Sequence, residues 1–87
     1  MGLFKRRQKA ASRVTLMLRT QSGKPCKLIA EPWGSEFPFD PGEQLTIEVT
    51  PDSAGRIEVS HYEDSVVVWS SVDEPIIRDG SRNILPL

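Results

Sequence analysis

The stretch from Glu31 to Thr50, EPWGSEFPFDPGEQLTIEVT, constrains the fold more than any other part of the chain. It places a Pro-Trp-Gly turn and an Asp-Pro-Gly-Glu turn before a strict alternation of apolar and polar residues. Leu45, Ile47 and Val49 fall on one face of that alternation, and polar residues fall on the other. Apolar residues at period two, bounded by Pro and Gly, are typical of a half-buried β-strand.

Similar short patterns recur along the chain, separated by turn residues, at the spacing of roughly 8–12 residues that is common in small β-proteins. The segments that we predict as strands are residues 13–20, 26–31, 37–39, 44–50, 56–62, 65–71, 76–78 and 82–85. Pro38 places the third segment at a sheet edge, because proline cannot donate a backbone hydrogen bond. We therefore predict an all-β fold, a small antiparallel sandwich or barrel of about seven or eight short strands with a basic N-terminal arm.

Loop lengths suggest how these strands pair. The five-residue loop 21–25 joins the first two segments, and the five-residue loop 51–55 joins the fourth and fifth. We expect each loop to close an antiparallel hairpin. We also expect Asp79-Gly80 to form the tight turn of a last hairpin.

The second of these hairpins would bring two acids together. Its register places Glu48 opposite Glu58, and like charges directly opposite each other are unfavourable. A cation from the first hairpin, Arg19 or Lys27, is expected to offset that repulsion.

A chain of 87 residues has room for one domain. We assign residues 1–12 to a basic arm, disordered or in a short helix, and residues 13–87 to a single β domain. No apolar run approaches the roughly 18 residues of a membrane-spanning helix. Cys26 is the only cysteine, so an internal disulfide is impossible. The basic start lacks the apolar stretch of a secretion signal, so we predict a cytoplasmic location, or one within an assembly formed there.

The formal net charge of −1 hides a strong asymmetry. Residues 1–30 carry eight cations and no acid, which gives +8, whereas residues 31–87 carry three cations and all twelve acids, which gives −9. Such a division favours an arm that contacts a polyanion, or one that folds back on its own acidic body.

Four cations concentrate in the arm, namely Lys5, Arg6, Arg7 and Lys9. Three interpretations of this cluster remain open. It forms a solvated tail, or it contacts nucleic acid or an anionic membrane surface, or it docks into a protein partner, which includes another copy of the chain.

Two tryptophans stand out against the polar composition. Trp33, between Pro and Gly, is either a plug over the end of the core or an exposed anchor for a partner. Trp69 closes the unbroken apolar run Val66–Trp69. An unbroken run indicates a strand with both faces covered, or one whose second face meets a partner.

His61 is the only histidine, so any catalytic triad would need it. Ser60 and Ser65 are close in sequence, and Glu63 follows, but this spacing is not diagnostic. A strand-end histidine packed against Leu45 is the simpler interpretation. No nucleophile elbow, metal-ligand set or phosphate-binding glycine loop occurs, and we predict a chain that is not an enzyme and holds no cofactor or metal.

The segment EPWGSEFPFDPGEQLTIEV, followed by VVVWS, resembles small uncharacterised bacterial all-β proteins with a Pro-Trp-Gly … Pro-Gly-Glu pattern. The resemblance covers about half the chain, Glu31 to Ser71, and implies an all-β fold without an assigned activity. FPFDPGEQLTIEV is also similar to the N-terminal part of a cupredoxin. The copper site of that family needs a second histidine, which this chain lacks.

These observations favour a non-catalytic structural or interaction module, such as an accessory protein of a phage particle or multi-subunit complex. A protein partner or self-assembly is expected, with Lys5, Arg6, Arg7, Lys9 and Trp33 as contact residues. One alternative is nucleic-acid or anionic-surface binding through the arm. Another is a small-ligand or enzymatic pocket near His61.

Overall fold

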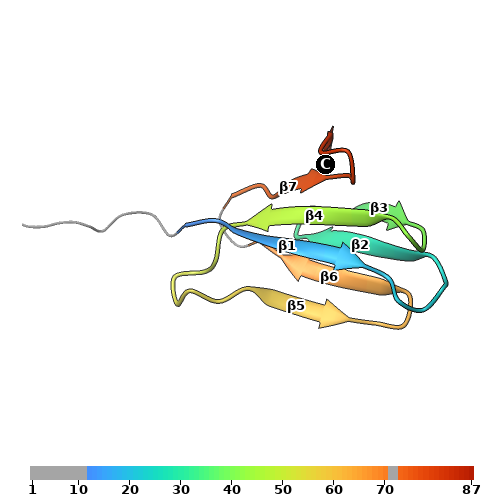
Figure 1. The fold of residues 1–87 in the computed structure, drawn as a ribbon. Coiled ribbons are helices and arrows are strands. Elements are labelled where there is room, and N and C mark those ends of the chain that lie inside the picture. The colour runs from blue at the N-terminus through green and yellow to red at the C-terminus, as the bar shows by residue number, and fades with distance from the viewer. Residues whose placement is uncertain (1–11, 71–72) are drawn as a thin grey trace, which may run out of the picture.

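Eight short strands build the part of the chain that the computed structural model describes, residues 12–70 and 73–87 (Figure 1). The strands are β1 (Val14–Arg19), β2 (Cys26–Glu31), β3 (Ser35–Phe39), β4 (Gln44–Val49), β5 (Glu58–His61), β6 (Ser65–Trp69), β7 (Ile76–Arg78) and β8 (Ile84–Leu85). The predicted all-β class is confirmed.

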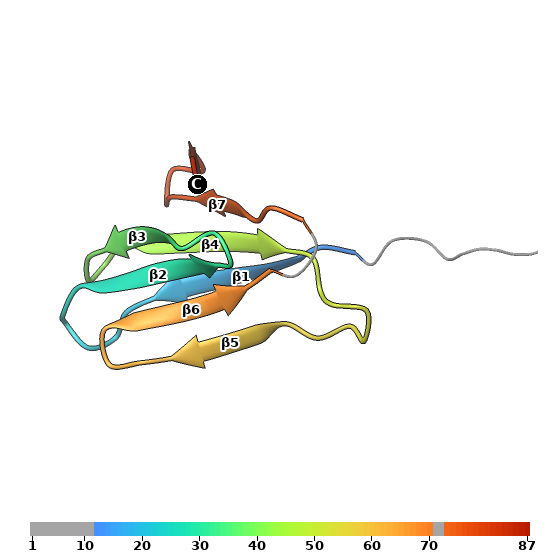
Figure 2. The same ribbon diagram turned by 180° about the vertical axis from the view of Figure 1, so that it is seen from behind.

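The strands form two four-stranded sheets that pack face to face. Sheet A has the order β1-β4-β7-β8, and sheet B has the order β3-β2-β6-β5. All neighbours are antiparallel except β2 and β6, which run parallel in the middle of sheet B. Figure 2, from behind, shows β2 and β6 side by side with their arrowheads at the same end. The architecture is therefore a sandwich.

Two local predictions are confirmed. β3 lies at the edge of sheet B and carries Pro38, as the missing donor of proline requires. β7 and β8 form the last hairpin, with Arg78 opposite Ile84. The turn between them is organised by Asp79, whose Oδ1 accepts hydrogen bonds from the backbone N–H groups of Ser81 and Asn83, both at 2.9 Å.

The predicted hairpin of the first two strands is wrong. β1 pairs with β4 in sheet A, whereas β2 pairs with β3 and β6 in sheet B. The loop 21–25 therefore crosses from one sheet to the other. Turn residues indicate where the chain reverses, but a five-residue loop can close a hairpin or cross the sandwich with similar residues.

The predicted pairing of the fourth and fifth strands is wrong for the same reason. Glu48 of β4 stands opposite Thr15 and Ile76, and Glu58 of β5 lies in the other sheet. The cations beside Glu48 also differ from the predicted pair. Arg13 Nε lies 3.3 Å from Glu48 Oε2, and Arg78 Nη1 lies 3.1 Å from Glu48 Oε1.

The core lies between the sheets, on the inward positions of the alternating strands. Its buried members are Leu28, Ala30, Phe37, Phe39, Leu45, Ile47, Val49, Val68 and Ile77. Leu45, Ile47 and Val49 are buried as the alternation predicted. Burying each such aliphatic side chain contributes roughly 1.5–3 kcal/mol before entropic costs, which is how a chain of this size holds two sheets together.

No helix long and apolar enough to cross a membrane occurs among the described residues. The predicted arm, apart from Ser12, lies outside these residues, and so do its four cations.

Candidate interaction surface

The outward face of sheet B carries a tryptophan between two glutamates. Glu58 of β5 and Glu31 of β2 are the cross-strand partners of Trp69, one on each side of β6. The three residues therefore form one row across three adjacent strands. We call Glu31, Trp69 and Glu58 the acidic tryptophan row.

The strand geometry of β6 explains why Trp69 points outward. Successive side chains of a strand alternate between faces. Val68 is 1% exposed in the core, while Trp69 is 43% exposed. The interpretation of the apolar run Val66–Trp69 as a strand covered on both faces is therefore wrong at Trp69, and contact of the second face with a partner stays a prediction. Beside the row, the outward Val67 pairs with Ile29 of β2, so the row borders a small apolar strip.

The two glutamates of the row have no ion-pair partner among the described residues. Lys27, on the same face of β2 as Glu31, is already bound, because its Nζ lies 3.1 Å from Glu36 Oε1. Arg56, two residues before Glu58, pairs instead with Asp52 at 3.4 Å. Within the described residues, the row thus presents two carboxylates without an ion pair beside an exposed aromatic ring.

The turn after β2 places the second tryptophan at the same end of the sheet. The Gly34 N–H donates to the Ala30 carbonyl at 2.8 Å, which closes the turn around Trp33. Gly34 has φ +73°, a conformation that glycine adopts without steric cost. A Cβ on Gly34 would lie 3.8 Å from Glu31 Oε1, so the Glu31 carboxylate reaches this turn. Trp33 is 38% exposed and outside the core, which favours the anchor over the plug.

This arrangement suits a positively charged ligand group. A guanidinium or ammonium over an indole face gains about 0.5–1 kcal/mol at an exposed site from the ring quadrupole. Carboxylates on both sides add hydrogen bonds and charge attraction, which are strongest for the planar guanidinium of arginine.

His61 lies at the opposite end of the sandwich from the row. It is exposed and stands opposite Val66, not against Leu45 as predicted. A hollow of about 320 Å³ brings it near Cys26 and Glu63. The Cys26 thiol is directed to the Lys27 carbonyl at 3.9 Å, and the His61 imidazole makes no hydrogen bond with the described residues. The hollow thus lacks an assembled nucleophile and base.

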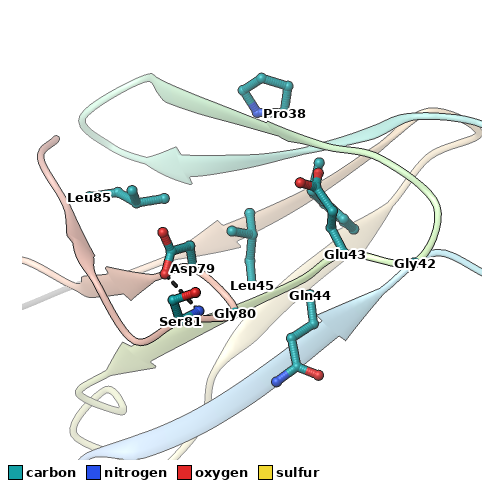
Figure 3. Close-up of a pocket in the computed structure, with 10 residues that line it drawn as sticks. Pro38, Gly42, Glu43, Gln44, Leu45, Asp79, Gly80, Ser81 and Leu85 are labelled. Carbon is teal, nitrogen blue, oxygen red and sulfur yellow. Dashed lines mark hydrogen bonds between the residues drawn. The ribbon is translucent and has the colours of Figure 1, made fainter.

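A second hollow, of about 540 Å³, lies between the β3–β4 and β7–β8 turns. Figure 3 shows its lining, with Asp79 joined to Ser81 by a hydrogen bond. The other carboxylate there is Glu43, whose Oε1 accepts from the Asp40 N–H at 2.7 Å. Both acids are engaged in their own turns, so the hollow offers no free catalytic pair.

No group of three or more His, Cys, Asp or Glu side chains is arranged to hold a metal ion within residues 12–70 and 73–87. Of the contact residues expected from the sequence, Trp33 lies beside the row. Lys5, Arg6, Arg7 and Lys9 fall outside the described residues.

The row itself was not predicted. Glu58 was expected opposite Glu48 because the loop 51–55 was expected to close a hairpin, and the parallel contact that places Glu31 beside Trp69 has no local signature. One signal was available. Only two residues, Glu63 and Asp64, lie between Tyr62 and Ser65. The Tyr62 N–H donates a hydrogen bond to the Ser65 carbonyl at 2.8 Å. A loop this short favours pairing β5 with β6, and that pairing places Glu58 beside Trp69.

Comparison of the chain with protein-family models, with curated proteins and with solved structures gives no match.

Proposed function

We propose that the chain is a non-catalytic interaction module that binds an arginine- or lysine-rich segment of a protein partner. The module acts within a larger assembly, formed in the cytoplasm, for which it is an accessory protein. The observation that carries this proposal is the acidic tryptophan row, in which an exposed tryptophan is flanked by two glutamates that have no ion-pair partner among residues 12–70 and 73–87.

A basic segment fits this surface better than a nucleic acid does. The residues that the structure describes carry seven cations and twelve acids, a net charge of −5. Phosphate backbones bind through clustered cations, and the carboxylates of the row would repel them. Trp33, at the edge of the row, adds an aromatic surface for the aliphatic stems of lysine or arginine.

Calorimetric titration with a capped peptide of three Arg-Gly repeats tests the proposal. The same peptide with citrulline in place of arginine is the neutral control. A full-length K5Q/R6Q/R7Q/K9Q variant, which lacks the four N-terminal cations, is titrated beside the natural chain. We expect the arginine peptide to bind at least one of these two proteins, and the citrulline peptide to bind neither.

The variants that locate the binding are E31Q/E58Q and Trp69→Ala. The E31Q/E58Q change should weaken binding about tenfold, which corresponds to about 1.4 kcal/mol. Glu63→Gln is the matched control, because Glu63 is exposed at the other end of β5 and β6. Binding that neither row variant weakens, or no binding by either protein, would overturn the proposal.

A further inference from the structure

We infer that the basic N-terminal segment of the same chain, residues 5–9, covers the acidic tryptophan row in the free protein. A partner's basic segment must then displace it. This inference rests on the proposed function, because it names what occupies the same surface before the partner arrives.

The first support is where the N-terminal segment joins the sandwich. β1 begins opposite the end of β4, with Val14 paired to Val49. Arg13 Nη2 donates to the Glu74 carbonyl at 2.9 Å, which fixes the start of β1 beside the chain that follows β6. Figure 2 shows the start of β1 at the same end as the arrowheads of β2 and β6.

The row lies at this end of the sandwich, because Glu31 and Trp69 are the last residues of β2 and β6. The two strand ends are held together there, since the Ser70 N–H donates to the Glu31 carbonyl at 2.9 Å. The segment before Arg13 therefore enters the fold at the end of the sandwich that carries the row.

The second support is the length of this segment. Packed sheets lie about 10 Å apart, so a chain that passes around the end of the sandwich from sheet A to the outward face of sheet B must span roughly 15–20 Å. An extended chain covers at most about 3.3–3.6 Å per residue. From Ser12, Arg7 is about 17 Å away at full extension and Lys5 about 24 Å. The extended length from Ser12 to Arg7 or Lys5 therefore matches the distance that the chain must span to the row.

The third support is charge. Residues 1–11 carry four cations and no acid, and the described residues carry a net charge of −5. Neither acid of the row has an ion-pair partner within residues 12–70 and 73–87. Lys27, on the same strand as Glu31, and Arg56, two residues before Glu58, are bound to other acids.

A tethered segment is favoured over the same segment of a second copy. A short flexible linker gives an effective concentration in the millimolar range, well above the micromolar concentrations of most protein samples. At ordinary protein concentrations the contact within one chain is therefore more populated than the contact between two chains, even when the segment has a weak intrinsic affinity for the row.

The peptide titration separates this inference from the proposed function. If the segment covers the row, K5Q/R6Q/R7Q/K9Q should bind the arginine peptide at least threefold more tightly than the natural chain, and the gain should shrink as salt is raised. Equal affinity of the two proteins would overturn the inference and leave the proposed function standing. Binding by neither protein would overturn the proposed function.

A direct contact measurement completes the test. A nitroxide is placed at Gln8→Cys in a Cys26→Ala background, and the indole N–H signals are assigned with Trp33→Phe. Broadening of the Trp69 indole signal is expected, and it should be lost when the four cations are replaced by Gln. Lack of broadening overturns the inference. Broadening only between labelled and unlabelled molecules in a mixture would also overturn it, because the occupant would then be a second copy.

Discussion

Glutamates on the outward faces of the two sheets have opposite surroundings. In sheet A, Glu48 is held by two arginines, with Arg13 at 3.3 Å and Arg78 at 3.1 Å. In sheet B, Glu31 and Glu58 flank an exposed tryptophan and have no ion-pair partner among the described residues. Glutamate is thus held by ion pairs on the outward face of sheet A, whereas on the outward face of sheet B it has none within the part of the chain that the structure describes.

The network around Glu48 shows what a structural role looks like here. Arg13 also donates to the Glu48 carbonyl at 2.9 Å and to Thr50 Oγ1 at 3.3 Å. Thr50 in turn donates to Asp73 Oδ2 at 3.3 Å. One arginine thereby ties the start of the chain to β4 and to the segment before β7. Among the residues that the structure describes, no comparable network of side chains engages the acids of the row.

The largest expected effect comes from the core that both faces share. Ile47 is fully buried on the inward face of sheet A. Ile47→Ala should lower the free energy of unfolding by about 3 kcal/mol, because it removes buried apolar surface and leaves a cavity. Trp69→Ala removes a half-exposed side chain and should cost only about 1 kcal/mol. Urea denaturation measures both. A larger loss for Trp69→Ala than for Ile47→Ala would show that Trp69 belongs to the core.

The next largest effect is the difference in unfolding free energy between substitutions of Glu48 in sheet A and Glu58 in sheet B. Glu48→Gln weakens two ion pairs at a partly buried site and should lower the free energy of unfolding by about 1–2 kcal/mol. Glu58→Gln breaks no ion pair with a described residue and should leave the free energy of unfolding unchanged to within about 0.5 kcal/mol. Thermal melts of the two variants at the same pH and salt test this. Equal losses would mean that both glutamates serve the fold.

Two glycine turns give a smaller effect and sharpen the comparison. Gly34 and Gly42 have φ values of +73° and +89°, and an alanine at either should cost about 1 kcal/mol of stability. Only Gly34 lies beside the Glu31 carboxylate. Gly34→Ala should therefore change peptide affinity as well, whereas Gly42→Ala should not. A change in affinity for both variants would indicate a general loss of structure.

The smallest effect concerns acid sensitivity. The Asn83 backbone N–H, helped by the Asn83 side chain and the Ser81 N–H, holds the pKa of Asp79 below its usual value. The Arg56 backbone N–H does the same for the pKa of Asp52. A carboxyl with a lowered folded-state pKa stabilises the fold above its unfolded pKa, near pH 4. That contribution is lost as the pH falls through the folded-state pKa.

Asp79→Asn should therefore be less stable than the natural chain at neutral pH, and the difference should shrink below about pH 4. Thermal melts from pH 7 to pH 2.5 measure this convergence. A difference that grows on acidification would contradict the assigned cause. Glu63→Gln is the comparison, because Glu63 makes no hydrogen bond of this kind among the described residues.

The strands were predictable because their signals are local. Alternation in β4, the proline of β3 and the Asp79-Gly80 turn each act over a few residues, and each appears where the sequence placed it. Strand pairing was less predictable. The loops 21–25 and 51–55 cross between sheets, and the parallel pairing of β2 with β6 joins segments far apart in the chain. The row depends on how the strands pair, so Glu31 and Glu58 were not predicted as contact residues. Trp33 was predicted as one, because the turn that holds it has a local sequence signal.

The most direct test of the difference between the faces is a ¹⁵N NMR titration of the K5Q/R6Q/R7Q/K9Q variant with the arginine peptide. If the row binds the peptide, shifts concentrate on Glu31, Glu58 and Trp69, including the Trp69 indole N–H. The signals of Thr15, Glu48 and Ile76 in sheet A then stay unchanged. Shifts centred on sheet A, or on the hollow near His61, would contradict binding at the row.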